Sequence, residues 1–240
     1  SEMCIRDRFN GIHEGLVQSW KDIFPKKGEI HFAGALENNE DTGTLQYLAS
    51  TAMEAGFSTR VLDMQALDLQ NGRFFDPAGE LVNRCFKLYP WEWMVDESPD
   101  GCLAEMEWLE PIWKLVMSNK AILATLYELF PDSPYVLPCY LSRPRSGLFC
   151  KKPVFSREGH NVSVVDIRDW EEYVRIAETE GDYNTGAYVY QEYVEPTAYS
   201  GRYPVIGSWI IGGEAAGIGI RENRMEVTDN LSEFVPHIIG

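Results

Sequence analysis

The sequence has few basic residues, few cysteines and no long apolar run. Lys and Arg number 21 against 37 Asp and Glu, which gives a formal net charge of -16. Nucleic acids and anionic membranes both favour a basic surface, so this balance argues against either as a general partner. The five cysteines form no C-x-x-C pair, and no histidine stands at metal-ligand spacing. We therefore expect neither a zinc site nor a disulfide framework.

Two further absences bear on where the protein is located in the cell and on which type of nucleotide site it could have. No apolar run approaches the roughly 20 residues that cross a bilayer, and no basic region followed by an apolar one opens the chain. We expect a cytoplasmic protein with reduced thiols. The sequence G-x-x-x-x-G-K-[ST] is also absent, which excludes a P-loop.

The composition suits a globular protein with a real core. The chain has 240 residues, of which 45% are hydrophobic, enough for one large domain or two smaller ones. Its first residues, Ser1 to Arg8, look foreign to the rest of the chain. Read back into codons, this stretch resembles the end of a sequencing-library transposon, so we interpret it as a non-native leader.

The first hundred residues predict a βαβ-like unit. Strands are expected at Glu29–Gly34 and Phe57–Asp63, with a helix over Leu45–Ala55 between them. Asp41 or Thr42 is the expected N-cap of that helix, and Gly56 is its expected stop. The polar loop 37–44 would then lie at the carboxyl end of a strand, where α/β sheets bind ligands.

Further elements are predicted from apolar periodicity and turn residues. Helices are expected at 9–24, 103–117 (broken by Pro111) and 121–130, and the status of 168–183 is left open. An Asn71-Gly72 hairpin and a strand over 81–88 are expected. Beyond residue 135 the pattern changes to short strands, at 135–141, 147–154, 162–167, 187–194, 205–211 and 215–220.

A strand that ends in two lysines and runs into a polar turn is the most unusual stretch. Lys151 and Lys152 precede the turn 156–161, which holds Arg157. Backbone N–H groups and fixed cations together suit a polyphosphate. A solvated hairpin with scattered charges remains an alternative.

Four elements occur in the order that an ATP-binding cleft needs. Lys120 begins a helix, Lys152 ends a strand, the turn 156–161 comes next, and the apolar strand 189–194 carries Gln191 and Glu192. Apolar walls with a few polar groups suit an adenine ring, and two lysines from separate elements suit its phosphates. This order resembles the ATP-grasp fold.

The resemblance narrows to one family over nearly the whole chain, from residue 9 to 239. The segments that carry it are FAGALENNEDTGTLQYL, FKLYPWEWM, LEPIWKLVMSNKA, KKPVFSREGHNVS, YVYQEYV, YPVIGSWIIGGEAAGIGIRE and FVPHII. They are similar to the glutathionylspermidine synthase family, including homologues without an amidase domain. The resemblance implies an α+β, ATP-grasp-like protein with a βαβ-containing pre-ATP-grasp substrate lobe over 9–117 and an antiparallel nucleotide-binding lobe over 118–240.

The same resemblance implies the site residues. Phosphate and adenine contacts would come from Lys120, Lys152, Ser156, Glu158, Gly159, Gln191, Glu192, Tyr193 and Val194. Arg157 and Arg221 match arginines that reach the substrate and the acyl phosphate. Glu40 and Asp41 fall on the acidic loop associated with substrate binding.

The reaction implied is amide formation driven by ATP. A carboxylate attacks the γ-phosphate, and an amine then attacks the resulting acyl phosphate. ATP and Mg²⁺ are the implied cofactors, and glutathione and a polyamine are possible substrates. The family's magnesium ligands lie upstream of the segment that begins at Phe9, so we expect this piece to bind nucleotide without turnover.

Two alternatives stay open. One is a relative that binds ATP and hydrolyses it slowly, with a regulatory role and no glutathionylspermidine synthesis. The other is a structural α+β domain whose lysines are surface charges. Convergence of Lys120, Lys152 and Arg157 would argue against the second.

Overall fold

The computed structural model describes residues 10–169, 172–183, 186–224 and 232–236, in two compact units. The units comprise Ser1–Leu115 with Ser208–Ile218, and Val116–Gly207 with Gly219–Gly240. The predicted leader, Ser1 to Arg8, lies outside the described residues. None of the described helices is long and apolar enough to cross a membrane.

A parallel sheet organises the first unit, in the order β2-β1-β6-β7. The chain runs from β1 (Glu29–Gly34) through α3 (Asn39–Glu54) into β2 (Ser58–Asp63), which pairs with β1 in parallel. β6 (Arg84–Leu88) and β7 (Glu107–Leu109) extend the sheet on the other side of β1. The predicted βαβ unit is therefore confirmed.

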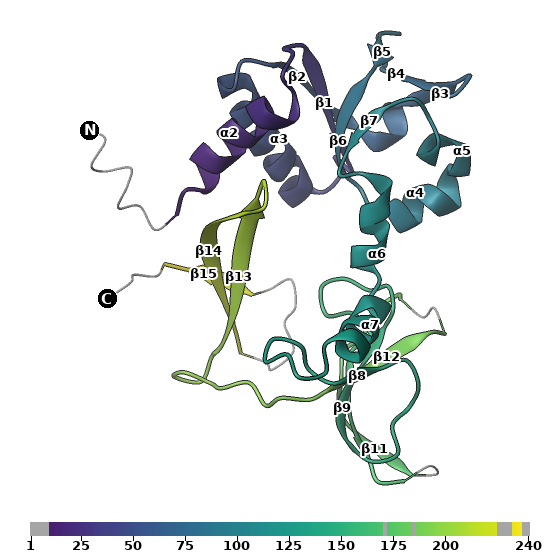
Figure 1. Ribbon diagram of the computed structural model, residues 1–240, viewed down its shortest axis with the longest axis vertical. Helices are drawn as coiled ribbons and strands as arrows, with labels where there is room; N and C mark the ends of the chain where they lie inside the picture. Colours follow the sequence, from purple (N-terminus) through teal and green to yellow (C-terminus); the bar gives the residue numbers. More distant parts are fainter. Residues whose placement is uncertain (1–9, 170–171, 184–185, 225–231, 237–240) are drawn as a thin grey trace. The chain divides into compact units, whose positions relative to one another are not determined.

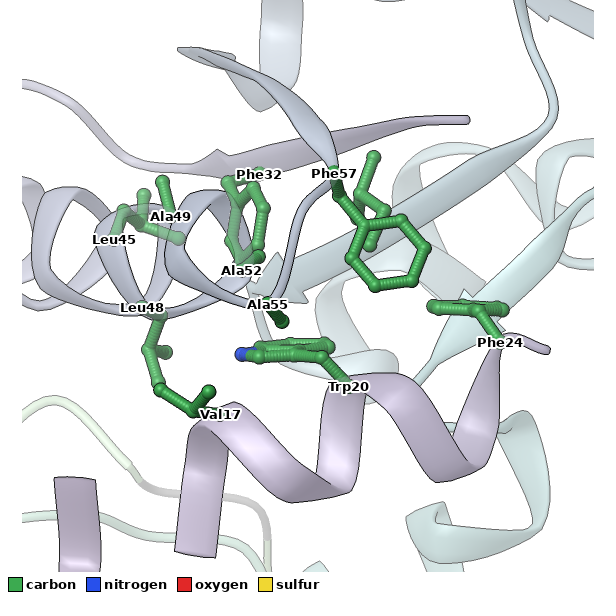
Figure 2. Packing of buried hydrophobic residues seen from close by; sticks show 11 residues of the cluster. Val17, Trp20, Phe24, Phe32, Leu45, Leu48, Ala49, Ala52, Ala55 and Phe57 are labelled. Carbon is green, nitrogen blue, oxygen red and sulfur yellow. The ribbon is translucent and has the colours of Figure 1, made fainter. Parts of the chain in front are cut away.

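Two helices cover one face of this sheet. α2 (Ile12–Ile23) and α3 lie beside β1 and β2 in Figure 1, and Figure 2 shows their apolar side chains meeting. Trp20 is buried against Phe32, with ring centroids 5.5 Å apart, and its Nε1 donates to Thr51 Oγ1 at 2.8 Å. The Thr51 hydroxyl also donates to the Leu48 carbonyl at 2.7 Å, so the polar atoms of Trp20 and Thr51 are paired inside the apolar layer.

The opposite face is covered by shorter elements. α4 (Trp91–Glu97) and α5 (Pro99–Cys102) pack there with a small antiparallel sheet. Its strands are β3 (Asp68–Gln70), β4 (Arg73–Phe75) and β5 (Leu81–Val82). Asn71 and Gly72 join β3 to β4 with φ of 52° and 75°, which confirms the hairpin that the sequence predicted.

Two sequence predictions in this unit are wrong. The single strand expected over 81–88 divides at Asn83 into β5 and β6, which belong to different sheets. The helix expected over 103–117 is replaced by β7, a 3₁₀ turn at Ile112–Lys114 and the short α6 (Leu115–Ser118). The edge of the parallel sheet binds Glu107–Leu109 as a strand, so tertiary pairing outweighs the local helical pattern.

The second unit contains an antiparallel sheet in the order β11-β10-β9-β12-β8. Its strands are β8 (Cys139–Tyr140), β9 (Gly147–Pro153), β10 (Ser163–Ile167), β11 (Tyr173–Glu178) and β12 (Tyr188–Glu192). α7 (Ala121–Leu129) packs on the face that holds Val189. The undecided region 168–183 supplies the edge strand β11, and the strand expected over 135–141 is reduced to two residues.

A fourth sheet completes the described fold, in the order β13-β14-β15. β13 (Tyr203–Ile211) and β14 (Glu214–Asn223) join through Gly212 and Gly213, whose φ values are 60° and 89°. β15 (Glu233–Val235) pairs with the end of β14. Parallel and antiparallel sheets with helices confirm the predicted α+β, ATP-grasp-like class.

A buried histidine lies beside the amino end of the parallel sheet. Neither ring nitrogen of His31 has a hydrogen-bond partner among the described residues. Its Nε2 is 3.7 Å from a Glu29 oxygen and 3.9 Å from an Asp76 oxygen, and Arg60 bridges both carboxylates. Burial lowers the pKa of His31 although the two carboxylates oppose that effect.

His31 should therefore make folding depend on pH. Above its unfolded pKa of 6.5, the histidine is neutral in both states. As the pH falls from that value towards the lowered native pKa, the unfolded chain binds the proton more readily, and stability falls. Urea titrations at about pH 7.5 and 5.5 should show a smaller loss for His31→Gln than for the parent. His13→Gln, at an exposed histidine, is the control, and an unchanged pH dependence in His31→Gln would contradict this role of His31.

Replacing two glycines by alanine should change the free energy of unfolding in opposite directions. A Cβ on Gly34 would lie 2.9 Å from Leu45 Cδ1 and 3.0 Å from the Leu88 carbonyl oxygen, whereas one on Gly43 would meet nothing within 4 Å. Gly34→Ala should lower the free energy of unfolding by about 1–3 kcal/mol through overpacking. Gly43→Ala, on an exposed helical position, should raise it by about 0.5–1 kcal/mol. Denaturant unfolding measures both, and equal effects would refute the close packing at Gly34.

Candidate functional site

Lys120 joins the start of α7 to the turn that comes after β9. Its backbone N–H donates to the Val154 carbonyl at 2.8 Å. Its Nζ donates to the carbonyl oxygen of Ser156 at 2.5 Å and to Ser156 Oγ at 2.9 Å. Two of the predicted phosphate-binding residues are thus in direct contact, although they lie 36 positions apart.

Lys152 contacts Gln191 across two paired strands. Its Nζ donates to Gln191 Oε1 at 2.7 Å, from β9 to β12. Gln191 is also the ladder partner of Cys150 on one side and of Cys139 on the other. Burial raises the pKa of both thiols and Lys152 opposes that effect, so they stay protonated at neutral pH. No thiolate is therefore expected beside the lysine.

The turn after β9 has an unusual backbone. Glu158, Gly159 and Asn161 adopt φ values of 55°, 74° and 55°. The His160 N–H donates to the Arg157 carbonyl at 2.8 Å, which closes the turn. The side chains of Arg157 and Glu158 are exposed at its tip. The predicted hairpin connection is confirmed, and Arg157 directly follows Ser156, the partner of Lys120.

A threonine beyond β11 anchors this turn, and sequence reasoning missed it. Thr179 Oγ1 donates to the Gly159 carbonyl and accepts from the Val162 N–H at 2.9 Å. Asn161 Oδ1 accepts from the Tyr183 N–H at 2.7 Å. These contacts come from a region whose structure the sequence left undecided, so no local signal could have identified them.

The predicted adenine segment continues β12 beyond the sheet. The Glu192 N–H donates to the Pro138 carbonyl at 2.8 Å, and the Tyr193 N–H donates to the Leu148 carbonyl at 3.0 Å. The side chains of Glu192 and Val194 are exposed. These two amides are thus already paired within the protein, and they fix the backbone of the segment.

The remaining predicted residues lie in other parts of the fold. Arg221 is on β14, with its guanidinium 5.8 Å from the Phe234 ring centroid. Glu40 and Asp41 are in the first turn of α3, not in a loop. The predicted caps Asp41 and Thr42 are wrong, because Asn38 caps the helix by accepting from the Glu40 N–H at 2.9 Å.

A second polar group, which the sequence did not single out, lies at the carboxyl end of the parallel sheet. Lys87 is buried on β6, where its Nζ donates to the Tyr89 carbonyl at 2.7 Å and lies 3.9 Å from the Trp91 ring. Asp63 accepts from the Leu36 N–H at 3.0 Å and from the Gln65 N–H at 2.8 Å. A signal for this group was present in the sequence. Lys87 lies within FKLYPWEWM, and a buried strand seldom carries a lysine.

Tyr89 belongs to the same group. Its hydroxyl donates to Glu97 Oε2 at 2.6 Å. Burial and then the neighbouring Glu97 carboxylate raise the pKa of Tyr89 to about 12, so it stays a neutral donor. In the part of the chain that the structure describes, no three His, Cys, Asp or Glu side chains form a group that could hold a metal ion.

A sequence profile described as the glutathionylspermidine synthase pre-ATP-grasp domain matches residues 2–240. This chain belongs to the glutathionylspermidine synthase family. The match spans both compact units, so it includes the lysine contacts and the parallel sheet.

Curated relatives agree with this membership. A Haemophilus influenzae protein provisionally named an acid–amine ligase is 35% identical over 97% of this chain and 62% of its own length. Trypanothione synthetase of Crithidia fasciculata is 28% identical over 86% of this chain and 35% of its own length. The bifunctional glutathionylspermidine synthetase/amidase of Escherichia coli is 26% identical over 96% of this chain and 42% of its own length. This chain therefore spans less than two thirds of each relative.

Removing the Thr179 hydroxyl should loosen the turn selectively. Thr179→Val leaves the buried Val162 N–H and the Gly159 carbonyl without this partner, at a cost of about 1–3 kcal/mol. Amide hydrogen exchange at Val162 should accelerate about ten- to a hundredfold. Thr125→Val, at an exposed position on α7, is the matched control. Unchanged exchange at Val162 in Thr179→Val would show that the hydroxyl does not anchor the turn.

Proposed function

We propose that this chain provides the nucleotide-binding part of an ATP-dependent acid–amine ligase. One observation carries the proposal. Contacts from α7, β9, the turn at 156–161 and β12 bring Lys120, Ser156, Lys152 and Gln191 to one antiparallel sheet. Two lysines on a preformed scaffold are what a triphosphate needs, because fixed cations neutralise its charge without reorganisation.

The partners of these lysines support that role. Lys120 and Lys152 donate to neutral oxygens of Ser156 and Gln191. The neutral Gln191 amide orients the Lys152 ammonium but leaves its charge available to phosphate oxygens. In our proposal Glu158 and Gly159 lie over the phosphates, and the segment from Gln191 to Val194 lies along the adenine.

The proposed chemistry forms an amide through an acyl phosphate. An oxygen of the acid attacks the γ-phosphorus, the bond to the β-phosphate breaks, and ADP leaves. The amine nitrogen then attacks the acyl carbon, phosphate departs, and the amine loses a proton. Arg157 and Arg221 would stabilise the acid and the acyl phosphate by bidentate contacts.

Mg²⁺ is proposed as a cofactor that accompanies ATP. Bound Mg²⁺ neutralises charge on phosphate oxygens. Within the described ranges no cluster of three acidic, histidine or cysteine side chains could supply its ligands.

The substrate class is argued from the relatives and from charge. Two relatives are named for making glutathionylspermidine or trypanothione. We propose a cationic amine as one substrate and a glutathione-like acid as the other. Exposed Glu40 and half-buried Asp41 in the first turn of α3 are the proposed amine contacts. Reduced, protonated thiols agree with a proposed cytoplasmic location.

ATP binding measured by calorimetry tests the proposal. Lys152→Gln should weaken ATP binding about ten- to a hundredfold, because a charge-assisted hydrogen bond contributes about 1.5–3 kcal/mol. Arg145→Gln removes one positive charge from an exposed position near the same sheet and should bind ATP like the parent. Equal weakening in both variants would mean that only net charge matters, and the nucleotide site would be wrong.

Product formation by the whole ligase, of which we propose this chain to be the nucleotide-binding part, separates the ligase from the slow ATP-hydrolysing alternative. ADP release that requires both glutathione and spermidine, with a new amide detected by mass spectrometry, supports the ligase. ATP binding with slow hydrolysis that neither compound accelerates favours the binding or regulatory role. The calorimetry on Lys152→Gln retains its meaning in either case.

A further inference from the structure

A small cavity lies on the face of the antiparallel sheet opposite to Lys152. Its volume is about 90 Å³, and its lining combines two cations, two aliphatic side chains and two tyrosines. These residues are Arg143, Lys151, Val165, Ile167, Tyr173 and Tyr190. The residues proposed for ATP do not line this cavity.

Lys151 and Lys152 lie on opposite faces of the antiparallel sheet, because side chains alternate along a strand. Lys151 and Lys152 are neighbours on β9, and Tyr190 and Gln191 are neighbours on β12. Successive side chains of a strand point to opposite faces. Lys152 contacts Gln191 on one face, so Lys151 and Tyr190 lie together on the other.

Arg143 is held in place with one donor unused. It donates from one terminal nitrogen to the Asp169 carbonyl at 2.9 Å, and its guanidinium lies 4.9 Å from the Tyr173 ring centroid. Its Nε is buried and has no hydrogen-bond partner among the described residues. An unsatisfied buried donor is unfavourable, and an acceptor that enters the cavity would remove that cost.

The positive charge of the cavity is not neutralised by a carboxylate in the described part of the chain. Lys151 Nζ lies 3.9 Å from the Tyr188 ring, a contact that leaves its charge intact. No ion pair joins Arg143 or Lys151 to a described acidic side chain. Glu178 on the neighbouring strand pairs with Arg175. In a chain of net charge -16, two such cations side by side are unusual.

We propose that this cavity binds a small oxyanion, a phosphate or carboxylate group, between Arg143 and Lys151. Arg143 Nε–H and the Lys151 ammonium would donate to its oxygens. Val165, Ile167, Tyr173 and Tyr190 supply the rest of the lining. Burial raises the pKa of Tyr190, so its hydroxyl remains a neutral donor. The volume suits one such group or a few waters and is too small for a nucleotide.

Thermal unfolding with inorganic phosphate or acetate tests the site at constant ionic strength balanced with chloride. At ten times its dissociation constant the preferred anion should raise the Tm by about 3–6 °C. Arg143→Gln should abolish this rise, and Arg143→Lys, which retains the charge but not the Nε donor, should reduce it. Arg145→Gln is the charge-matched control and should retain the rise.

Two comparisons make the result decisive. Lys152→Gln should retain the anion-dependent rise, since that side chain is on the other face. Loss of the rise in Lys152→Gln with retention in Arg143→Gln would overturn the proposal and place the anion with Lys120 and Lys152. No rise with either anion would also overturn it.

Should Arg143→Gln fail to fold, a titration of the unaltered chain monitored by NMR replaces it. Phosphate or acetate should shift the ring signals of Tyr173 and Tyr190 saturably and leave those of Tyr135, an exposed tyrosine, unchanged. Shifts confined to residues near Lys120 and Ser156 would refute the cavity site. A preference for phosphate over acetate, or the reverse, identifies which oxyanion the cavity accepts.

Discussion

The hydrogen bond from Lys152 to a neutral amide is the interaction on which the proposed nucleotide site depends. A carboxylate at position 191 would orient the ammonium equally well, but it would cancel the charge that a phosphate needs. Gln191 supplies an acceptor at 2.7 Å without a negative charge. The strand ladder holds Gln191 between β8 and β9, so the lysine is positioned by the sheet itself. Lys120 likewise donates to two oxygens of Ser156.

An acidic protein can present such cations only where its carboxylates are kept away or engaged elsewhere. Several arginines of the first unit are paired with glutamates, as Arg73 is with Glu105 and Arg84 with Glu107. In the antiparallel sheet, Lys152 contacts an amide oxygen and Lys151 contacts an aromatic ring. Excess negative charge and local anion binding are therefore compatible, because the distribution of partners matters more than the total.

Local patterns predicted those parts of the fold whose pairing is local or whose turns need special residues. The Asn71-Gly72 hairpin, for example, depends on residues adjacent in sequence. β7 could not be predicted, since it depends on the open edge that β6 provides about 20 residues earlier. β11 pairs with the strand just before it, β10, but the polar residues of 168–183 left its structure undecided. For the site, family motifs supplied Lys120 and Lys152, but Thr179 and Arg143 act through contacts that only the folded chain creates.

The hairpin of β13 and β14 has a consequence for dividing the protein into pieces. Its central part, Ser208–Ile218, belongs to the first compact unit, although it comes after most of the second in sequence. The Gly11 N–H donates to the Ala216 carbonyl at 2.8 Å, and Asn10 Oδ1 accepts from the Ile218 N–H at 3.0 Å. A polypeptide that stops near residue 115 would lose these partners. Separate expression of the first unit therefore requires this distant segment, fused or supplied as a peptide.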